Sequence, residues 1–199
     1  MSGFNLTPAS KKLVNHYVTL ALSTGDSFLN SLLGTETRKT LSELYLDGDS
    51  LFSHKHTKFM INGENVGGMI LSYPAKISPK GMLKTALRIL KNSPRTLFTR
   101  LGDLLKAKTL FGPIKKSDYY ICFLAVHPQF RNLGLASKML EHAKEESLKN
   151  GCKRIILEVE SENTNAIKFY KKRGFKRLCL IKVEIKSKEH SYFKMAASA

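Results

Sequence analysis

The feature that most constrains this chain is the order of strand, loop, helix and strand in its C-terminal half. Residues 119–126, YYICFLAV, form the longest uninterrupted apolar run, and the loop RNLGLA at 131–136 joins it to an amphipathic segment at about 134–149. A second strand-like run follows at 154–160. Because crossover connections between parallel strands are right-handed, this order predicts two parallel strands in one sheet.

Further helices and strands are predicted on both sides of this unit. Three helices are expected in the first fifty residues. Thr7 and Pro8 are typical of the start of the first helix, and Asp26 is a candidate cap for the second. An apolar stripe at 41–45 indicates the third helix. The other expected elements are a β-hairpin at 56–73 that turns at Asn62 and Gly63, a helix at about 164–173, and extended runs at 175–185 and 190–195.

The net charge of +17 is concentrated in one segment. Residues 75–116 hold eleven Lys or Arg against one acid, Asp103. Ser78 and Ser93 each precede a proline, which is a helix-start signal, and two basic amphipathic helices with apolar faces that pack on the domain are expected over 78–108. Their apolar positions are Met82, Leu83, Ala86, Leu87 and Leu90 in the first helix and Leu97, Phe98, Leu101, Leu104 and Leu105 in the second.

The cationic faces of these two helices predict attraction to an anionic partner. An acidic protein and an anionic lipid surface both fit a basic amphipathic helix. Phe98 and Phe111 are the only aromatic residues in 75–116, so a platform for stacking bases is not indicated and a nucleic acid is the least favoured partner.

Composition excludes several classes of protein. No apolar run approaches the roughly 20 residues of a membrane-spanning helix, and the N-terminus MSGFNLTPASKK lacks the apolar core of a secretory signal, so a cytoplasmic location is expected. Cys122, Cys152 and Cys179 form no CxxC pair and are expected to be reduced and structural, since no local pattern supplies the base that a nucleophilic cysteine needs. No cluster has metal-ligand spacing, so no metal site is expected.

The loop at 131–136 is the strongest candidate for a binding site. The first backbone N–H groups of a helix have no intrahelical acceptor, and together with the helix dipole they attract an anion. Gly134 permits unusual φ values and close approach of a phosphate, Ala136 keeps the next turn small, and Arg131 adds a cation. Taken alone, this pattern fits an ordinary connection between strand and helix as well as an anion site.

Two motifs in this order resemble the GCN5-related N-acetyltransferase superfamily. The family's acetyl-CoA-binding motif runs Gln or Arg, any two residues, Gly, any one residue, and Gly or Ala, and Arg131, Gly134 and Ala136 fill it. A second family pattern follows with every spacing kept. Its positions are Asn163, Ala166, Tyr170, Gly174 and Phe175. The resemblance covers 119–178 well and the hairpin more loosely.

The resemblance implies an α/β (α+β) fold with one N-acetyltransferase domain over 1–199. In that fold a central mixed, mostly antiparallel twisted sheet has flanking helices, and the basic segment 75–116 is an insertion before the central cofactor-binding strand. Acetyl-CoA is the implied donor, with its pyrophosphate on backbone N–H groups of the loop and its pantetheine arm along the strand at 119–126. The implied binding residues are Leu124, Ala125, Val126, Arg131, Asn132, Leu133, Gly134, Leu135, Ala136, Ser137 and Asn163.

The resemblance also implies direct attack of an amine on the thioester. Tyr170 would donate a hydrogen bond or a proton to the departing sulfur, because a phenol with a pKa near 10 keeps its proton at neutral pH. Glu158 is the implied base, by similarity to the ribosomal-protein alanine acetyltransferases; Glu160, on the same strand face, and a water path are alternatives. For Asn163 a helix-capping role is the alternative, for Tyr170 simple packing on the sheet, and for both glutamates a solvent-facing position.

The acceptor is left open between a small-molecule amine and a protein or peptide amine. A rival function uses the same scaffold without catalysis, as an acyl-CoA-sensing or nucleic-acid-binding module. The pairing of Tyr170 with Glu158 favours the acetyltransferase.

Overall fold

The computed structural model describes residues 3–92, 102 and 114–199. Within these residues, seven strands form one sheet in the order β1-β2-β3-β4-β5-β7-β6, in which β4 and β5 are parallel and the other neighbours are antiparallel. The predicted mixed, mostly antiparallel sheet is confirmed. The strands are β1 (Asn5–Pro8), β2 (Thr57–Asn62), β3 (Asn65–Pro74), β4 (Asp118–Val126), β5 (Arg154–Glu160), β6 (Lys176–Ile185) and β7 (Lys188–Ser198).

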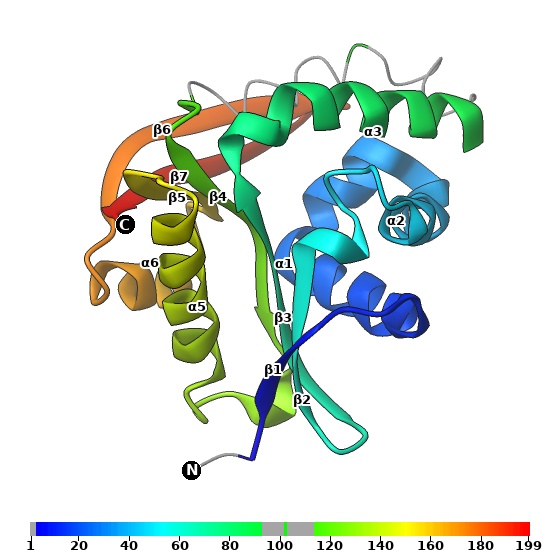
Figure 1. Ribbon diagram of the computed structural model, residues 1–199. Coiled ribbons are helices and arrows are strands. Elements are labelled where there is room, and N and C mark those ends of the chain that lie inside the picture. Colours follow the sequence, from blue (N-terminus) through cyan, green and yellow to red (C-terminus); the bar gives the residue numbers. More distant parts are fainter. Residues whose placement is uncertain (1–2, 93–101, 103–113) are drawn as a thin grey trace.

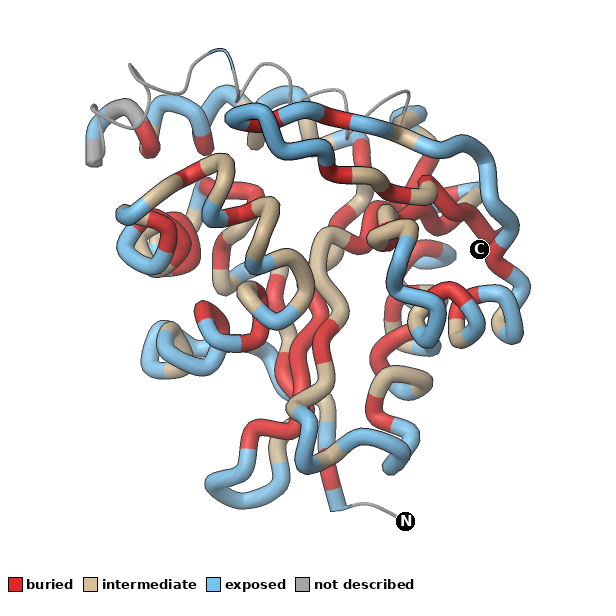
Figure 2. The backbone as a smooth tube through the Cα atoms, turned by 180° about the vertical axis from the view of Figure 1, so that it is seen from behind, coloured by how far each residue is buried: buried red, intermediate tan, exposed pale blue. Residues whose placement is uncertain are grey.

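Helices cover both faces of the sheet (Figure 1). One layer holds α1 (Val14–Leu33), α2 (Thr37–Leu46) and α3 (Ser78–Asn92), and the other holds α5 (Leu135–Lys149) and α6 (Thr164–Lys171). Figure 2 shows the buried residues gathered along the strands and on the inner sides of these helices. The two larger apolar clusters of the core therefore lie on opposite sides of the sheet.

The central strand β4 carries a β-bulge where it separates from β5. The pairing of β3 with β4 skips Cys122, which makes it the extra residue. β4 pairs with β5 only from Asp118 to Ile121, so the β5-facing edge of residues 122–126 has no strand partner among the described residues. Because a bulge bends its strand and increases the local twist, it accounts for this divergence.

A buried ion pair fixes the end at which β4 and β5 do meet. Asp118 is fully buried at the start of β4 and accepts two hydrogen bonds from Arg154 of β5, at 2.9 and 3.0 Å. The backbone N–H of Lys115 donates a third, at 2.8 Å. A bidentate pair of this kind fixes geometry as well as charge, so the parallel register is held where the strands begin.

The N-terminal predictions are partly wrong. Thr7 and Pro8 do not begin a helix but lie in β1, at the edge of the sheet, where a proline is tolerated because the strand has one free side. The break near Asp26 is confirmed, since α1 is kinked at Gly25. Asp26 accepts a hydrogen bond from the side chain of Asn30 at 2.8 Å, in place of the predicted cap. The third helix is confirmed as α2.

The remaining element predictions agree with the structure. The hairpin is confirmed as β2 and β3, and Gly63 in its turn has a φ of 57°. The expected elements of the C-terminal half are confirmed as β4, α5, β5, α6, β6 and β7, with shifts of a few residues at their ends. No helix in the described ranges is both long and apolar enough to cross a bilayer.

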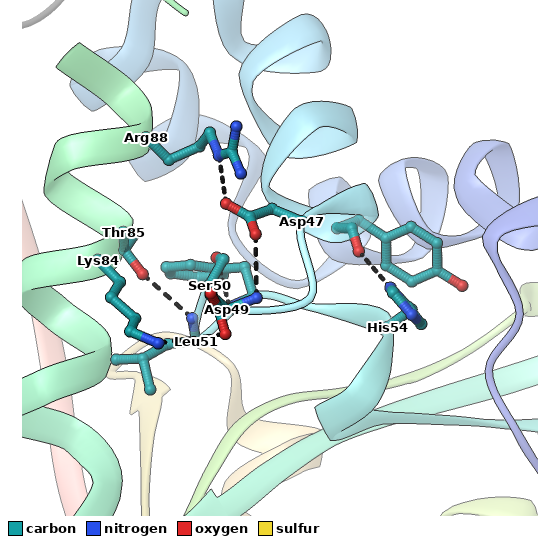
Figure 3. Close-up of polar contacts among 10 residues, drawn as sticks. Asp47, Asp49, Ser50, Leu51, His54, Lys84, Thr85 and Arg88 are labelled. Carbon is teal, nitrogen blue, oxygen red and sulfur yellow. Dashed lines mark hydrogen bonds and ion pairs between the residues drawn. The ribbon is translucent and has the colours of Figure 1, made fainter. Parts of the chain in front are cut away.

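Helix α3 docks on the segment after α2 through polar contacts (Figure 3). The contacts are Thr85 with the N–H of Leu51 (3.1 Å), Lys84 with Asp49 (3.2 Å), and Arg88 with Asp47. Gly81 lets the helix approach closely, because a Cβ there would overlap the side chain of Leu51. These contacts fix which side of α3 faces the domain.

The predicted apolar face of α3 is wrong in part. Leu83 and Leu87 are 63% and 55% exposed and Ala86 is exposed as well, whereas Thr85 and Ile89 are buried. The reason is the set of polar contacts just described, which turns the helix so that these two leucines lie on its outer side. The second predicted basic helix falls almost wholly within 93–113, outside the described residues apart from 102.

Candidate active site

The loop between β4 and α5 has the backbone shape of an anion site. Asn132 and Gly134 have φ values of 64° and 78°, and Gly134 directly precedes α5. The N–H groups of Ser137 and Lys138 both donate to the Gly134 carbonyl, at 3.0 and 3.1 Å, so the N–H groups just before them are the ones without an intrahelical acceptor. A Cβ at Gly134 would have no described heavy atom within 4 Å, so this side of the loop is open.

The side chains of the loop divide between core and surface. Leu135 is buried in the core beneath α5, whereas Arg131, Asn132 and Leu133 are exposed. The hydroxyl of Ser137 accepts a hydrogen bond from Arg173, which links the start of α5 to the end of α6. The loop therefore exposes backbone N–H groups and the Arg131 cation, and the packing of Leu135 holds it in place.

The end of β4 supplies an unpaired backbone edge close to this loop. The side chains of Leu124 and Val126 face the α5 and α6 layer, and that of Ala125 faces the α1 and α2 layer. Beyond the bulge, the edge of these residues toward β5 has no strand partner. An extended ligand can therefore take hydrogen bonds there as an added strand would.

Tyr170 lies on α6, where its ring packs between two other aromatic rings. The ring centres of Phe169 and Phe175 lie 5.3 and 5.5 Å from its own, and Tyr170 is buried. Burial raises the pKa of Tyr170 well above that of a free phenol, so the hydroxyl is protonated at neutral pH. This hydroxyl makes no hydrogen bond with another described residue and is available as a donor.

Glu158 lies in a buried polar network on the opposite face of the sheet. The hydroxyl of Tyr120 donates to Glu158 Oε2 at 2.6 Å, and Nζ of Lys194 lies 3.3 Å from Oε1. Burial raises the pKa of Glu158, while the Tyr120 hydrogen bond and the positive charge of Lys194 oppose that rise. The predicted solvent-facing alternative is wrong for Glu158, because its side chain is buried.

Glu160 is the last residue of β5, and Asn163 lies just before α6. Burial, together with the charge of Glu162, raises the pKa of Glu160, so it is a more basic carboxylate than a free one. Asn163 caps α6, since its side-chain oxygen accepts the N–H of Ala166 at 3.0 Å. The capping role predicted as an alternative for Asn163 is confirmed.

One cavity of about 540 Å³ joins the two faces of the sheet at the divergence of β4 and β5. Tyr170 reaches it from one face and Glu158 from the other. The predicted site residues that line it are Leu124, Ala125, Val126, Arg131, Glu158, Asn163 and Tyr170, with the alternative base Glu160. The other predicted loop residues, 132–137, lie next to Arg131 but do not line the cavity itself.

The cysteines in this region are unsuited to nucleophilic chemistry. All three cysteines are free, and Cys122 lines the cavity. Burial raises the pKa of the Cys122 thiol far above neutrality, which keeps it in its unreactive protonated form. Within the described ranges, no group of three or more His, Cys, Asp or Glu side chains is placed to hold a metal ion.

Tyr120 and Lys194 are functional-site residues that the sequence did not indicate. Tyr120 reaches Glu158 because β4 and β5 are parallel in this register, and Lys194 lies opposite Glu158 in the antiparallel pairing of β5 with β7. A lysine at 2% side-chain exposure is rare, and its sequence context of Phe193 and Met195 was the one available signal. Alternation alone does not reveal which strand is its neighbour.

Comparison with known proteins identifies the family. A family model described as the acetyltransferase (GNAT) family matches residues 62–175, more than half of the chain. N-alpha-acetyltransferase 30 of Saccharomyces cerevisiae is 39% identical over 59 residues, which are 30% of this chain and 34% of that protein. N-alpha-acetyltransferase 60 of Danio rerio is 35% identical over 79 residues, which are 38% of this chain and 31% of that protein. The matches thus span about a third of these relatives' length.

Solved structures share the whole fold. An N-acetyltransferase from Staphylococcus aureus Mu50 has a TM-score of 0.72 at 20% identity, covering 97% of this chain and 100% of that one. A variant of agmatine N-acetyltransferase in its apo form has a TM-score of 0.65 at 11% identity, covering 100% of both chains. Together with the family model, these comparisons confirm the resemblance carried by the two sequence motifs: the chain belongs to the acetyltransferase (GNAT) family.

Proposed function

We propose that this chain transfers an acetyl group from acetyl-CoA to a primary amine by direct attack on the thioester. The observation that carries the proposal is the single cavity lined by the hydroxyl-bearing Tyr170, the carboxylate of Glu158 and the free edge of β4 at 124–126. An acid and a base reach one space from opposite faces of the sheet, which is the arrangement that acyl transfer to an amine needs.

The loop before α5 fits the diphosphate of the donor. Positive φ values at Asn132 and Gly134 turn successive backbone N–H groups outward, and the space beside Gly134 is open. Arg131 of this loop also lines the cavity and adds a positive charge. Residues 132–137 would hold the pyrophosphate, and Leu124 to Val126 the pantetheine arm, by backbone hydrogen bonds. The side chain of Asn163 lies beside that arm's path.

The buried surroundings of Tyr170 and Glu158 suit them to act as hydrogen-bond donor and as base. The acceptor nitrogen attacks the thioester carbonyl, its proton passes to Glu158, and the bond between carbon and sulfur breaks. Tyr170 is protonated and has an unused hydroxyl, so it donates a hydrogen bond to the sulfur as negative charge develops there. The sulfur leaves as CoA thiolate, which takes up a proton, and Glu158 returns its proton to water. Glu160 is the second carboxylate that can receive the amine proton.

The names of the curated relatives support an amine at the start of a peptide chain as one acceptor. Both relatives described above are N-alpha-acetyltransferases, although each match spans only about a third of the relative. Low-identity structural neighbours add no preference, because they support the fold alone.

The proposal is tested by calorimetric titration of acetyl-CoA followed by a thiol-release assay across alkylamines, polyamines, aminoglycosides and peptides. Glu158→Gln should lower kcat/KM by about 10²-fold or more, since general base catalysis supplies roughly 10² to 10⁴ in rate. Glu184→Gln, an exposed glutamate on β6, is the matched control and should leave it unchanged. Binding of acetyl-CoA without turnover of any amine would favour the sensor function, and absence of binding would refute both.

A further inference from the structure

The cavity extends beyond the catalytic groups into a chamber beneath α1, α2 and α3. We call this part the helical chamber. Its walls are apolar side chains from segments that are far apart in the sequence. They are Phe28, Leu29, Leu32 and Leu33 of α1, Leu41 and Leu44 of α2, Leu51 and Phe52 of the following segment, and Met82, Ala86 and Ile89 of α3.

The hydroxyl groups that α1 and α3 bring to the cavity each already make one hydrogen bond with the backbone, whereas the hydroxyls of Tyr73, Tyr120 and Tyr192 belong to the strands. Ser23 and Thr24 each donate to a carbonyl one turn earlier in α1, both at 2.7 Å. Thr85 accepts the N–H of Leu51 at 3.1 Å, a contact drawn in Figure 3. A polar ligand would thus find few hydrogen-bonding partners here, and burying its polar groups without partners is costly.

The charged side chains that line the cavity come from β5 and from the loop before α5, and none comes from the walls of the helical chamber. Among the described lining residues, the charged side chains are Arg131, on the donor side, and the pair Glu158 and Glu160 on β5. Glu158 is balanced by Lys194 at 3.3 Å. Glu160 therefore offers a carboxylate to one ammonium group at the mouth of an otherwise uncharged chamber.

From these observations we infer that the acceptor is a primary amine carried on a bulky apolar group. The apolar group fills the helical chamber, and the amine lies against the β5 carboxylates beside the thioester. This inference rests on the proposed function and narrows its acceptor. It disfavours polyamines and aminoglycosides, because their additional ammonium groups would be buried against apolar walls. Ligand sites of this size and character are typical of apolar small molecules and side chains.

The test is a homologous series of n-alkylamines from ethylamine to n-hexylamine, assayed by thiol release. Each methylene that enters the chamber should raise kcat/KM about threefold to fourfold. Ethanolamine, close in size to n-propylamine but polar, should be the poorer substrate, and spermidine poorer than n-hexylamine. Peptides that begin with Leu or Ser form a second arm, which decides whether the apolar group belongs to a free amine or to a peptide terminus.

Two tryptophan substitutions on α3 locate the effect. Met82→Trp places an indole at a partly buried position of α3 that lines the chamber, and it should lower kcat/KM for n-hexylamine at least tenfold, while KM for acetyl-CoA and turnover of ethylamine stay the same. Leu87→Trp, on the exposed side of the same helix, should change neither. Equal effects of the two variants would overturn the assignment of the chamber.

The outcomes separate this inference from the proposed function. If amines are acetylated but kcat/KM depends neither on the length of the alkylamine nor on the first residue of the peptide, the inference is overturned and the acetyltransferase proposal stands. The inference would also be overturned if lengthening the acyl donor raised kcat/KM more than lengthening the amine did. In that case the pair hexanoyl-CoA and ethylamine would react faster than the pair acetyl-CoA and n-hexylamine, because the chamber would hold the acyl chain. If no amine is acetylated, calorimetric binding of n-hexylamine and ethanolamine to protein saturated with CoA decides: tenfold tighter binding of n-hexylamine supports the apolar site, and equal binding refutes it.

Discussion

The two ends of the cavity are built in different ways. The proposed donor end uses backbone conformation, namely the positive φ values of Asn132 and Gly134 and the free edge of residues 124–126, all close together in the sequence. The acceptor end uses side chains from α1, α2 and α3, with the carboxylates of β5 beneath them. One end is thus a local chain shape, and the other depends on tertiary packing.

This difference explains why a donor motif can be identified while the acceptor cannot. A phosphate held by N–H groups requires glycine and small residues at fixed spacing, because only these permit the backbone to approach it. An apolar chamber requires only bulk and shape, and many combinations of Leu, Phe, Met and Ile supply them. A substitution at one end should therefore affect mainly the ligand that binds at that end.

The largest expected effect is at the point where the two ends meet. Tyr170→Phe removes the hydroxyl that we propose as the hydrogen-bond donor to the sulfur and should lower kcat about 10²-fold, because such a donor acts mainly in the transition state. KM for acetyl-CoA should change little, since the ring still packs between Phe169 and Phe175. Steady-state kinetics with circular dichroism as a folding control check this. A parallel loss of acetyl-CoA affinity and of turnover would assign Tyr170 a packing role only.

The next effect depends on pH and concerns the base. The positive charge of Lys194 favours ionised Glu158 and so lowers its pKa. Lys194→Met should therefore raise that pKa, leave more Glu158 protonated in acid, and lower kcat/KM about tenfold at pH 6 while sparing it near pH 9. The readout is the profile of kcat/KM from pH 6 to 9.

Two variants control for loss of charge and loss of packing. Lys194→Arg keeps the charge and should recover activity in acid, and Lys182→Met removes an exposed lysine of β6 and should leave the profile unchanged. A drop that is equal at every pH would mean that Lys194 supports the fold around Glu158 without influencing its protonation.

A smaller effect is expected at the donor loop. Gly134→Ala places a Cβ at a φ of 78° and faces it toward the space assigned to the phosphate. Left-handed backbone costs an alanine about 1 to 2 kcal/mol, so KM for acetyl-CoA should rise about fivefold to thirtyfold with kcat preserved. Gly151→Ala, at a φ of 66° beyond the other end of α5, carries similar strain and should leave KM unchanged. An equal rise in both variants would point to general destabilisation.

The C-terminal half of the fold was predicted from the sequence, and the residues of the proposed donor end were singled out from it as well. The motif residues Arg131 to Ala136 and Asn163 to Phe175 carry their own local geometry, and the apolar run at 119–126 determines a central strand. The bulge at Cys122 is the exception, because it depends on how β3 and β4 pair and leaves no composition signal.

The arrangement of side chains at the acceptor end could not be predicted from the sequence, for physical reasons. Lys194 and Tyr120 meet Glu158 only through the registers of two different strand pairs. The orientation of α3 was predicted from its leucines, but hydrogen bonding and ion pairing decide it, so that Leu83 and Leu87 lie outside. Hydrophobic periodicity weighs apolar residues alone and misses a helix that docks through Thr85 and its charged neighbours.

The smallest expected effect tests that docking. Thr85→Val removes the acceptor of the Leu51 N–H, and a buried donor left without a partner costs about 1 to 3 kcal/mol. The free energy of unfolding, measured in urea, should fall by that amount, and Thr85→Ser, which keeps the hydroxyl, should recover most of it. Because α3 covers only the helical chamber, KM for n-hexylamine should rise modestly while the affinity for acetyl-CoA is preserved. A matching loss of acetyl-CoA affinity would show that the two ends of the cavity are structurally coupled, although one is formed by local chain shape and the other by tertiary packing.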